Sequence, residues 1–514
     1  MPSSTNTHDR VGLEKFGFRA SLRRTWPRVW PILLLGAVLR LLFLLVGAKV
    51  YYAGRQIDIH TTGDTFSYVL SFQNLLEYGR YTFDPREPDA SVGRLPGYPF
   101  FYGIHYLLFG AERAVAAVAV TQVLLDTLGI WLLYVITARL APPRSWAPTL
   151  GALLLAAYPF SIVWTTIVGT ESLGLFLVLL WWAVLLLGRR RPRTWLLLGC
   201  LLAVIVYVRE FLGVCLVVTV AYLFLSQERG QRRLPVALVL AGFLSLYIWW
   251  PIRNYVTLGR LIPLKPAAAG YANLREDTQA ALAWVLTWTN DVTMGIDEIL
   301  FAPKPAFPAH VISTAAEKQL LDSLIVLSRS CASSFHVRAQ AKLSASATPP
   351  ADPQAELLRH TNCNALVSKG FSRLRASYIA RHPVRARLEV PLHNFQKILF
   401  KSQFKTGAGA ALTTGQRVAA LLFTWRSIVL LVGLVGAWRF RRVPGLWPAL
   451  LFAALIFGYM AAIFRSMEMR YLLQADVVML VPAALLLGNL LPRRREKTVQ
   501  VVATRQELPL PANS

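Results

Sequence analysis

The sequence has few charged residues and lacks the common nucleotide-binding motifs. Charged side chains make up 16% of the 514 residues and hydrophobic ones 55%, which excludes an ordinary soluble globular protein. The chain contains no Walker loop and no dinucleotide-binding glycine fingerprint, so a soluble nucleotide or nucleotide-sugar substrate is not expected. No asparagine lies in an Asn-x-Ser/Thr sequon, which favours a bacterial periplasm or cell exterior over the endoplasmic reticulum lumen.

Only four cysteines are present, and they fall into two classes. Cys200 and Cys215 lie within apolar segments, where buried reduced thiols are expected. Cys331 and Cys363 share a large polar loop. If that loop lies outside the cytoplasm, a disulfide bond between them and a pair of free thiols remain equal alternatives.

The positive charge of the chain is unevenly distributed. The formal net charge is +27, and much of the excess lies in the termini and in short loops between apolar segments. This positive-inside distribution places those loops in the cytoplasm and gives no reason to expect nucleic acid as a partner. The Arg-rich segments are Arg23-Arg24, Arg189 to Arg193, Arg232-Arg233, Arg439 to Arg442 and Arg493 to Arg495.

Long apolar segments predict the fold class. An α-helix of roughly 20 apolar residues crosses the ~30 Å hydrocarbon core of a bilayer, and the segments are continuous rather than alternating, as helices in lipid require. We predict an all-α polytopic membrane protein with about 10 transmembrane helices, within a range of roughly 9 to 13. The predicted spans are residues 31–49, 113–138, 146–166, 171–188, 195–208, 211–225, 234–251, 416–438, 446–465 and 471–491.

The first span, which follows a basic tail and lacks a cleavage site, is expected to be a signal anchor. Two long segments do not fit a span, residues 50–99 and 252–415. Both fall on the side opposite the Arg-rich loops, so we expect them to form an extracytoplasmic cap. The segment from Phe100 to Phe109 remains open as a partial or re-entrant element.

The first extramembrane loop contains an isolated carboxylate before an amphipathic segment. From Asp64 to Tyr78 apolar residues recur mostly at helical spacing, which predicts an interfacial helix with Asp64 at its start. Asp64 has two interpretations, a helix N-cap or a general base. A cap tolerates asparagine whereas a base does not, so an Asn substitution separates them.

A second motif, Arg94-Leu95-Pro96-Gly97-Tyr98-Pro99, closes the same loop. The two prolines fix φ and the glycine between them is permissive, so the motif predicts a rigid turn. Its structural interpretation is re-entry of the chain into the membrane. Its functional interpretation is a fixed position for Arg94 beside an anionic group.

Charged residues at the predicted ends of spans also have two interpretations. Arg253 and Arg470 fall at outer ends, where they either snorkel to the headgroups or bind an anion. Glu171 lies in the first turn of a span, where an acid is favoured by the helix dipole. Asp126 lies inside a span at a free-energy cost, and no role is assigned to it.

The order of these motifs resembles the GT-C glycosyltransferases of the protein O-mannosyltransferase and aminoarabinose transferase type. The resemblance covers residues 31–265 and, more loosely, the last spans. The motifs that carry it, in chain order, are the first-loop acid, the Arg-x-Pro-Gly-Tyr-Pro entry, Thr170-Glu171, Arg209, Pro251-x-Arg253-Asn254-Tyr255 and Arg470-Tyr471.

The resemblance implies an inverting transferase in the plasma membrane that moves a sugar from a polyprenyl-phosphate donor to a glycan, lipid or protein acceptor on the outer face. Asp64 matches the catalytic aspartate, and arginines would hold the departing phosphate. Candidate phosphate ligands are Arg470, Arg253, Arg209, Arg94 and Tyr471. Candidate acceptor-orienting residues are Glu171, Tyr68 and Glu87.

The resemblance also implies a domain organisation. A GT-C-like catalytic module would span residues 31–265, between a cytoplasmic basic tail of residues 1–30 and a large extracytoplasmic loop of residues 266–415. C-terminal spans at 416–491 and a basic tail at 492–514 would follow. The extracytoplasmic loop is the expected source of acceptor specificity.

No cofactor is required by these motifs, although a divalent metal ion remains open. His60 and His105 are the weak candidate ligands, and neither has the spacing of a known metal site. Two alternative functions remain: a ligase or polymerase of lipid-linked oligosaccharide with a similar fold, and a transporter or flippase. A transporter predicts internal repeats and charges at the midplane, and no clear repeat is present.

Overall fold

The computed structural model describes most of the chain. The described residues are 18–52, 58–62, 64–82, 94–188, 191–226, 231–259, 261–264, 276–289, 299, 305–330, 353–400, 414–465 and 468–492. Within these ranges the regular elements are helices, with no strand, which confirms the predicted all-α class.

The helices form two groups. One group makes the apolar body: α1 (Phe18–Leu42), η1 (Phe43–Gly47), α2 (Ala48–Tyr51), α3 (Thr65–Tyr78), α4 (Gly97–Phe109), α5 (Ala111–Leu140), α6 (Ala147–Ala156), α7 (Pro159–Trp164), α8 (Thr170–Leu187), α9 (Pro192–Val208), η3 (Glu210–Gly213), α10 (Val214–Ser226), α11 (Arg233–Tyr247), α12 (Trp249–Leu258), α19 (Thr414–Arg439), α20 (Trp447–Tyr459), η5 (Met460–Phe464) and α21 (Met469–Leu490). The other group makes the cap and its connection: α13 (Glu276–Trp288), α15 (Ala315–Ser330), α17 (Pro353–Arg381), η4 (Arg385–Glu389) and α18 (Val390–Phe400).

Seven helical segments of the described chain are long and apolar enough to cross a membrane, so the protein is a multi-pass membrane protein. They are Trp26–Tyr51, Ala111–Leu140, Thr170–Leu187, Arg233–Leu258, Arg417–Arg439, Trp447–Phe464 and Met469–Leu490. Three shorter apolar helices coincide with the other predicted spans: Ala147–Ala156, Pro192–Val208 and Glu210–Ser226. The total of about 10 crossings stays a prediction.

The predicted span of residues 146–166 is broken in the structure. It divides into α6 and α7, and Tyr158 between them is extended, with φ −75° and ψ 106°. The cause is Pro159, which has no N–H to donate and disfavours helical backbone at the residue before it. A similar break at Arg209, with φ −156°, separates α9 from η3 and places this arginine at a helix end.

Two buried ion pairs join the helices of the body. Arg40 on α1 donates from Nε to Oδ2 of Asp126 on α5 at 2.5 Å, which explains how this carboxylate is tolerated inside a span. Arg426 on α19 binds both oxygens of Asp476 on α21 at 2.7 Å, and the hydroxyl of Tyr158 donates to the same carboxylate at 3.0 Å. These pairs hold helices that are distant in sequence.

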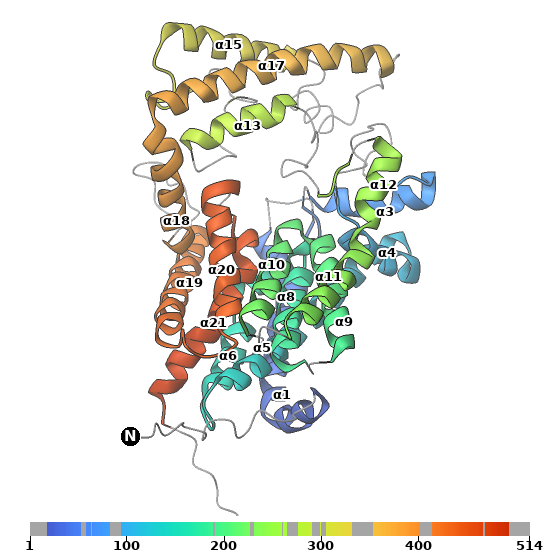
Figure 1. Ribbon diagram of the computed structural model, residues 1–514, viewed down its shortest axis with the longest axis vertical. Helices are drawn as coiled ribbons and strands as arrows, with labels where there is room; N and C mark the ends of the chain where they lie inside the picture. Colours follow the sequence, from blue (N-terminus) through green and yellow to red (C-terminus); the bar gives the residue numbers. More distant parts are fainter. Residues whose placement is uncertain are drawn as a thin grey trace, which may run out of the picture.

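The cap lies at one end of the molecule. In Figure 1, α15 and α17 lie at the top with α13 beneath them, and the chain then descends through α18 to α19. The cap has its own hydrophobic core, in which Trp284, Phe371 and Tyr378 are almost fully buried. The division of the chain at residues 266 and 415 stays a prediction.

Candidate active site

Asp64 lies at the start of α3, as predicted, but its carboxylate makes no cap hydrogen bond. The backbone oxygen of Asp64 instead accepts the N–H of Ser67 at 3.1 Å and the hydroxyl of Ser67 at 2.6 Å. The helix start is held by Thr65, whose hydroxyl donates to the carbonyl of Val168 at 2.9 Å. The carboxylate of Asp64 is therefore available for other partners.

Arg94 is the first of these partners. Its Nη2 lies 2.7 Å from Oδ1 of Asp64, while Nε donates to the Ser67 hydroxyl at 2.6 Å and Nη1 to the Tyr68 hydroxyl at 3.2 Å. The Tyr68 ring lies 4.2 Å from the guanidinium carbon. Because the Arg94 side chain is only 8% exposed and all three of its nitrogens are bound, its position is fixed.

Close packing of the turn after Arg94 explains the need for glycine. A Cβ atom at Gly97 would lie 2.6 Å from the carbonyl carbon of Tyr207 and 2.7 Å from the backbone nitrogen of Val208. Such distances are not tolerated, so only glycine lets α4 begin against the end of α9. This contact brings the turn that carries Arg94 beside the break that carries Arg209.

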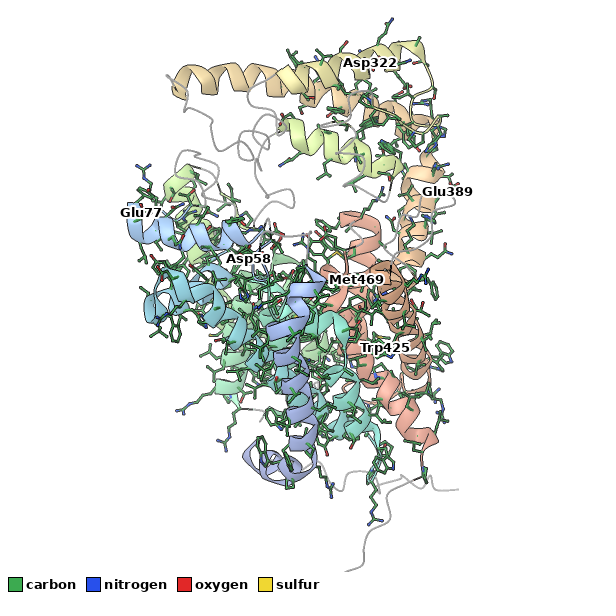
Figure 2. The ribbon with its side chains drawn as sticks, turned by 180° about the vertical axis from the view of Figure 1, so that it is seen from behind. Asp58, Glu77, Asp322, Glu389, Trp425 and Met469 are labelled. Atoms are coloured by element: carbon green, nitrogen blue, oxygen red, sulfur yellow. The ribbon has the colours of Figure 1, made fainter. Side chains whose placement is uncertain are left out.

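Arg470 at the start of α21 is the second partner of Asp64. Its Nη1 contacts Oδ2 of Asp64, its Nη2 donates to the Tyr471 hydroxyl at 3.0 Å, and its Nε lies 2.6 Å from Oε2 of Glu468. Figure 2 shows the labelled Met469 and Asp58 at the same level, where the apolar body meets the cap. Each oxygen of the Asp64 carboxylate therefore forms an ion pair with a different arginine.

The electrostatic setting of Asp64 favours its charged form. Burial alone would raise the pKa of this carboxyl group, but the charges and hydrogen bonds of Arg94 and Arg470 outweigh burial and hold the pKa well below its usual range. The side chain is 31% exposed. Asp64 is therefore ionised and reachable in this state, but it is a weak base while both arginines bind it.

A second, more deeply buried pair lies beside the first. Arg209 donates from Nη2 to Oε1 of Glu171 at 3.1 Å and from Nη1 to the backbone oxygen of Arg470 at 3.3 Å. Its guanidinium also lies 5.1 Å from the ring of Tyr471. Each of the three arginines at the site is thus already paired with a carboxylate.

Arg253 is connected to Arg94 through Tyr81. It donates from Nη2 to the carbonyl of Tyr81 at 2.8 Å, and the Tyr81 hydroxyl donates to the carbonyl of Arg94 at 3.0 Å. The rings of Tyr81 and Trp250 lie 5.4 and 5.2 Å from its guanidinium. This arrangement makes Arg253 a support for the loop that carries Arg94.

The two histidines proposed as weak metal ligands, His60 and His105, form hydrogen bonds within the protein. His60 Nδ1 lies 2.9 Å from the carbonyl of Thr166, and His105 bonds to Phe101 and Thr121, both at 2.8 Å. Among the described residues no group of three or more His, Cys, Asp or Glu is arranged to hold a metal ion.

Three predicted residues lie outside the described part of the chain. Glu87 and Cys331 fall outside the described ranges, as does the side chain of Cys363. The acceptor-orienting role of Glu87 and the alternatives for the two thiols therefore stay predictions.

Sequence reasoning did not identify three participants: Ser67, Tyr81 and Glu468. Ser67 had a detectable signal, because it lies one turn after Asp64 and therefore on the same face of the predicted helix. No pattern in the sequence distinguishes Tyr81 and Glu468 from other residues at membrane-facing loop ends. Tyr81 acts through a contact with Arg253 that lies 172 residues along the chain, and Glu468 acts on its near neighbour Arg470.

The chain resembles a known protein family in one segment. Residues 90–252 match the family model described as dolichyl-phosphate-mannose-protein mannosyltransferase. This match confirms the predicted resemblance to GT-C glycosyltransferases over that segment of the chain. Arg94, Glu171 and Arg209 lie inside the matching segment, whereas Asp64 and Arg470 lie on either side of it. No curated protein matches the chain.

Solved structures show distant similarity. The apo oligosaccharyltransferase from Archaeoglobus fulgidus shares 16% identity with a TM-score of 0.42, over 90% of this chain and 51% of that one. The chain thus spans about half of that enzyme. ArnT from Cupriavidus metallidurans, in a structure bound to undecaprenyl phosphate, shares 14% identity with a TM-score of 0.35, over 88% of this chain and 77% of that one.

Proposed function

We propose that this protein is an inverting glycosyltransferase that transfers a sugar from a polyprenyl-phosphate donor to an acceptor hydroxyl at the extracytoplasmic face of a bacterial plasma membrane. The observation that carries the proposal is the carboxylate of Asp64, held between Arg94 and Arg470 where the apolar body meets the cap. Such a site combines a base with fixed positive charge at a level that a lipid donor can reach.

In the proposed reaction the acceptor oxygen attacks the anomeric carbon of the sugar as Asp64 takes the proton of the hydroxyl group. The bond between the anomeric carbon and the phosphate oxygen breaks, and the electron pair leaves with polyprenyl phosphate. The guanidinium groups stabilise the charge that develops on the leaving oxygen. Glu171 supports this arrangement by pairing with Arg209, which also binds the backbone of Arg470.

The donor itself would activate the base. In the described state each guanidinium at the site is paired with a carboxylate, so an incoming phosphate must compete for Arg470 or Arg94. As an arginine turns to the phosphate, Asp64 loses a positive partner and its pKa rises toward the ordinary value. The carboxylate would then become a stronger base once the donor is bound.

The test uses membranes supplied with a labelled polyprenyl-phosphate sugar. Replacing Asp64 with asparagine keeps the shape of the side chain and removes its basicity, so transfer should fall by about 10²- to 10⁴-fold. Glu77→Gln is the matched control, because Glu77 is an exposed carboxylate on the same helix. Normal transfer by the Asp64→Asn variant would show that Asp64 is not the base.

A further inference from the structure

The cap contains a polar cluster that the proposed transfer reaction does not use. It comprises His310, Tyr378, Arg381 and Arg385, with Glu317 at its edge. His310 lies on the segment before α15, Tyr378 and Arg381 lie in the last turn of α17, and Arg385 begins η4. Figure 1 shows this end of α17, where the chain turns downward toward α18.

Several donor atoms of this cluster are buried without a hydrogen-bond partner in the described part of the chain. They are the Nε2 of His310, the hydroxyl of Tyr378, the Nε and Nη1 of Arg381 and the Nε of Arg385. A buried polar group without a partner is unfavourable, and more so if it is charged. A concentration of such groups in one cluster therefore indicates that a ligand completes it.

The aromatic rings at this site lie close together. Tyr378 is fully buried, and its ring centroid lies 6.3 Å from that of His310 and 5.0 Å from that of His382. Helical hydrogen bonds run from the N–H of His382 to Tyr378 and from the N–H of Ala386 to His382. Tyr378, Arg381 and Arg385 consequently lie on one face of a continuous helical segment.

Glu317 binds Arg381 through only one of the three guanidinium nitrogens. Its Oε1 and Oε2 lie 2.9 and 3.0 Å from the Nη2 of Arg381, and its oxygens also accept the Ser377 hydroxyl at 2.5 Å and the Ser313 N–H at 3.0 Å. The carboxylate is therefore saturated by its own neighbours. Arg381 is oriented by its Nη2 atom, whereas its Nε and Nη1 atoms have no hydrogen-bond partner among the described residues.

The charge balance of the cluster favours an anion. Burial lowers the pKa of His310, and the nearby charges of Arg385 and His382 lower it further. Glu317 pairs with Arg381, and Glu389, which is exposed on the descending helix as Figure 2 shows, acts on Tyr378 more weakly than either arginine does. Like charges one helical turn apart repel each other, and an anion beside Arg385 would offset this repulsion.

We propose that His310, Tyr378, Arg381 and Arg385 form a binding site for a phosphate group in the cap. Arginine side chains suit phosphate because they offer several directed donors, and the hydroxyl and imidazole groups add neutral ones. A phosphate group presents more acceptor positions than a carboxylate and can engage all of these donors at once. The phosphate belongs either to a lipid headgroup or to a soluble phosphorylated compound.

The test measures equilibrium binding of radiolabelled inorganic phosphate to the full-length protein in a neutral detergent, with chloride at matched ionic strength. The Arg470→Gln variant serves as the background, so that phosphate bound at the candidate active site does not contribute. We expect saturable binding. Arg385→Gln and Tyr378→Phe should each weaken it by roughly ten- to a hundredfold, because each removes a hydrogen bond to a charged group.

The control and the contrary outcomes are specific. Arg387→Gln removes an exposed arginine two residues from Arg385 and should leave binding unchanged. Tyr378→Phe keeps the ring packing, so its effect reports the hydroxyl group. Absence of saturable binding, or equal binding by all variants, would overturn the site without affecting the proposed transfer activity.

The two sources of phosphate are separated in lipid nanodiscs. If a lipid headgroup is the natural ligand, phosphatidylglycerol should suppress the binding of free phosphate relative to phosphatidylcholine. If a soluble phosphorylated compound is the ligand, phosphate should bind equally in both lipids.

Discussion

Arg470 contacts the carboxylate of Asp64 across a separation of 406 residues. The contact joins the first extramembrane loop to the start of α21, the most extensively buried of the candidate spans. It places fixed positive charge beside a carboxylate that is still 31% exposed. The proposed base and the proposed phosphate ligand therefore occupy one site.

Replacing Arg470 should impair use of the donor. Arg470→Gln removes a hydrogen bond to the donor phosphate, so the KM for the polyprenyl-phosphate sugar should rise by roughly ten- to a hundredfold. Arg470→Lys keeps the charge but loses the planar donor geometry, so it should retain more activity. Initial-rate measurements over a range of donor concentrations check both. Arg442→Gln, in an exposed loop, is the control, and an unchanged KM in Arg470→Gln would contradict the assignment.

Adding one methyl group at Gly97 should disturb the site without removing any of its charged side chains. In Gly97→Ala the new Cβ would meet the backbone of Tyr207 and Val208, so α4 and α9 must separate, at about 1–3 kcal/mol. Arg94 would move with the turn, and transfer should fall. Thermal unfolding and transfer assays measure the two effects. Gly458→Ala on α20 has no atom within 4 Å of the new Cβ and should behave as wild type.

The Arg426–Asp476 pair should contribute to stability. Arg426→Met leaves the carboxylate of Asp476 buried without its partner, which should lower the free energy of unfolding by about 3–5 kcal/mol. The double variant Arg426→Met/Asp476→Leu should recover most of that loss, because no unpaired charge remains. Unfolding in detergent with a chemical denaturant measures both variants. Equal destabilisation of the single and double variants would show that the unpaired charge of Asp476 is not the cause of the lost stability.

The ion pairs of Asp64 should make stability depend on pH in the acid range. Because the pKa of Asp64 is lower in the folded protein than in the unfolded chain, its contribution is fully present above the unfolded value of about 3.9. It is lost as the pH falls through the folded value. The unfolding midpoint, followed from about pH 5 to 2, should therefore fall less steeply in Asp64→Asn than in wild type. Glu77→Gln should follow wild type, and identical profiles for all three proteins would contradict the interpretation.

Much of the fold followed from the sequence, because helices in lipid must be apolar and continuous. The predicted spans coincide with the helical segments of the described chain, and the helix after Asp64 was predicted to within a residue at its start. The exception, the span predicted at residues 146–166, failed at Pro159, where a local backbone constraint outweighs apolar composition. A hydropathy pattern carries no information on the backbone conformation that a proline imposes.

The candidate site was predictable only as a set of separate residues. The sequence identified Asp64, Arg94, Glu171, Arg209 and Arg470 by residue type and order, and it left Asp64 open as a helix cap or a base. Only the tertiary structure decided that the carboxylate binds two arginines and that Glu171 pairs with Arg209. The physical reason is that an ion pair depends on distance in space, whereas the sequence records only position along the chain.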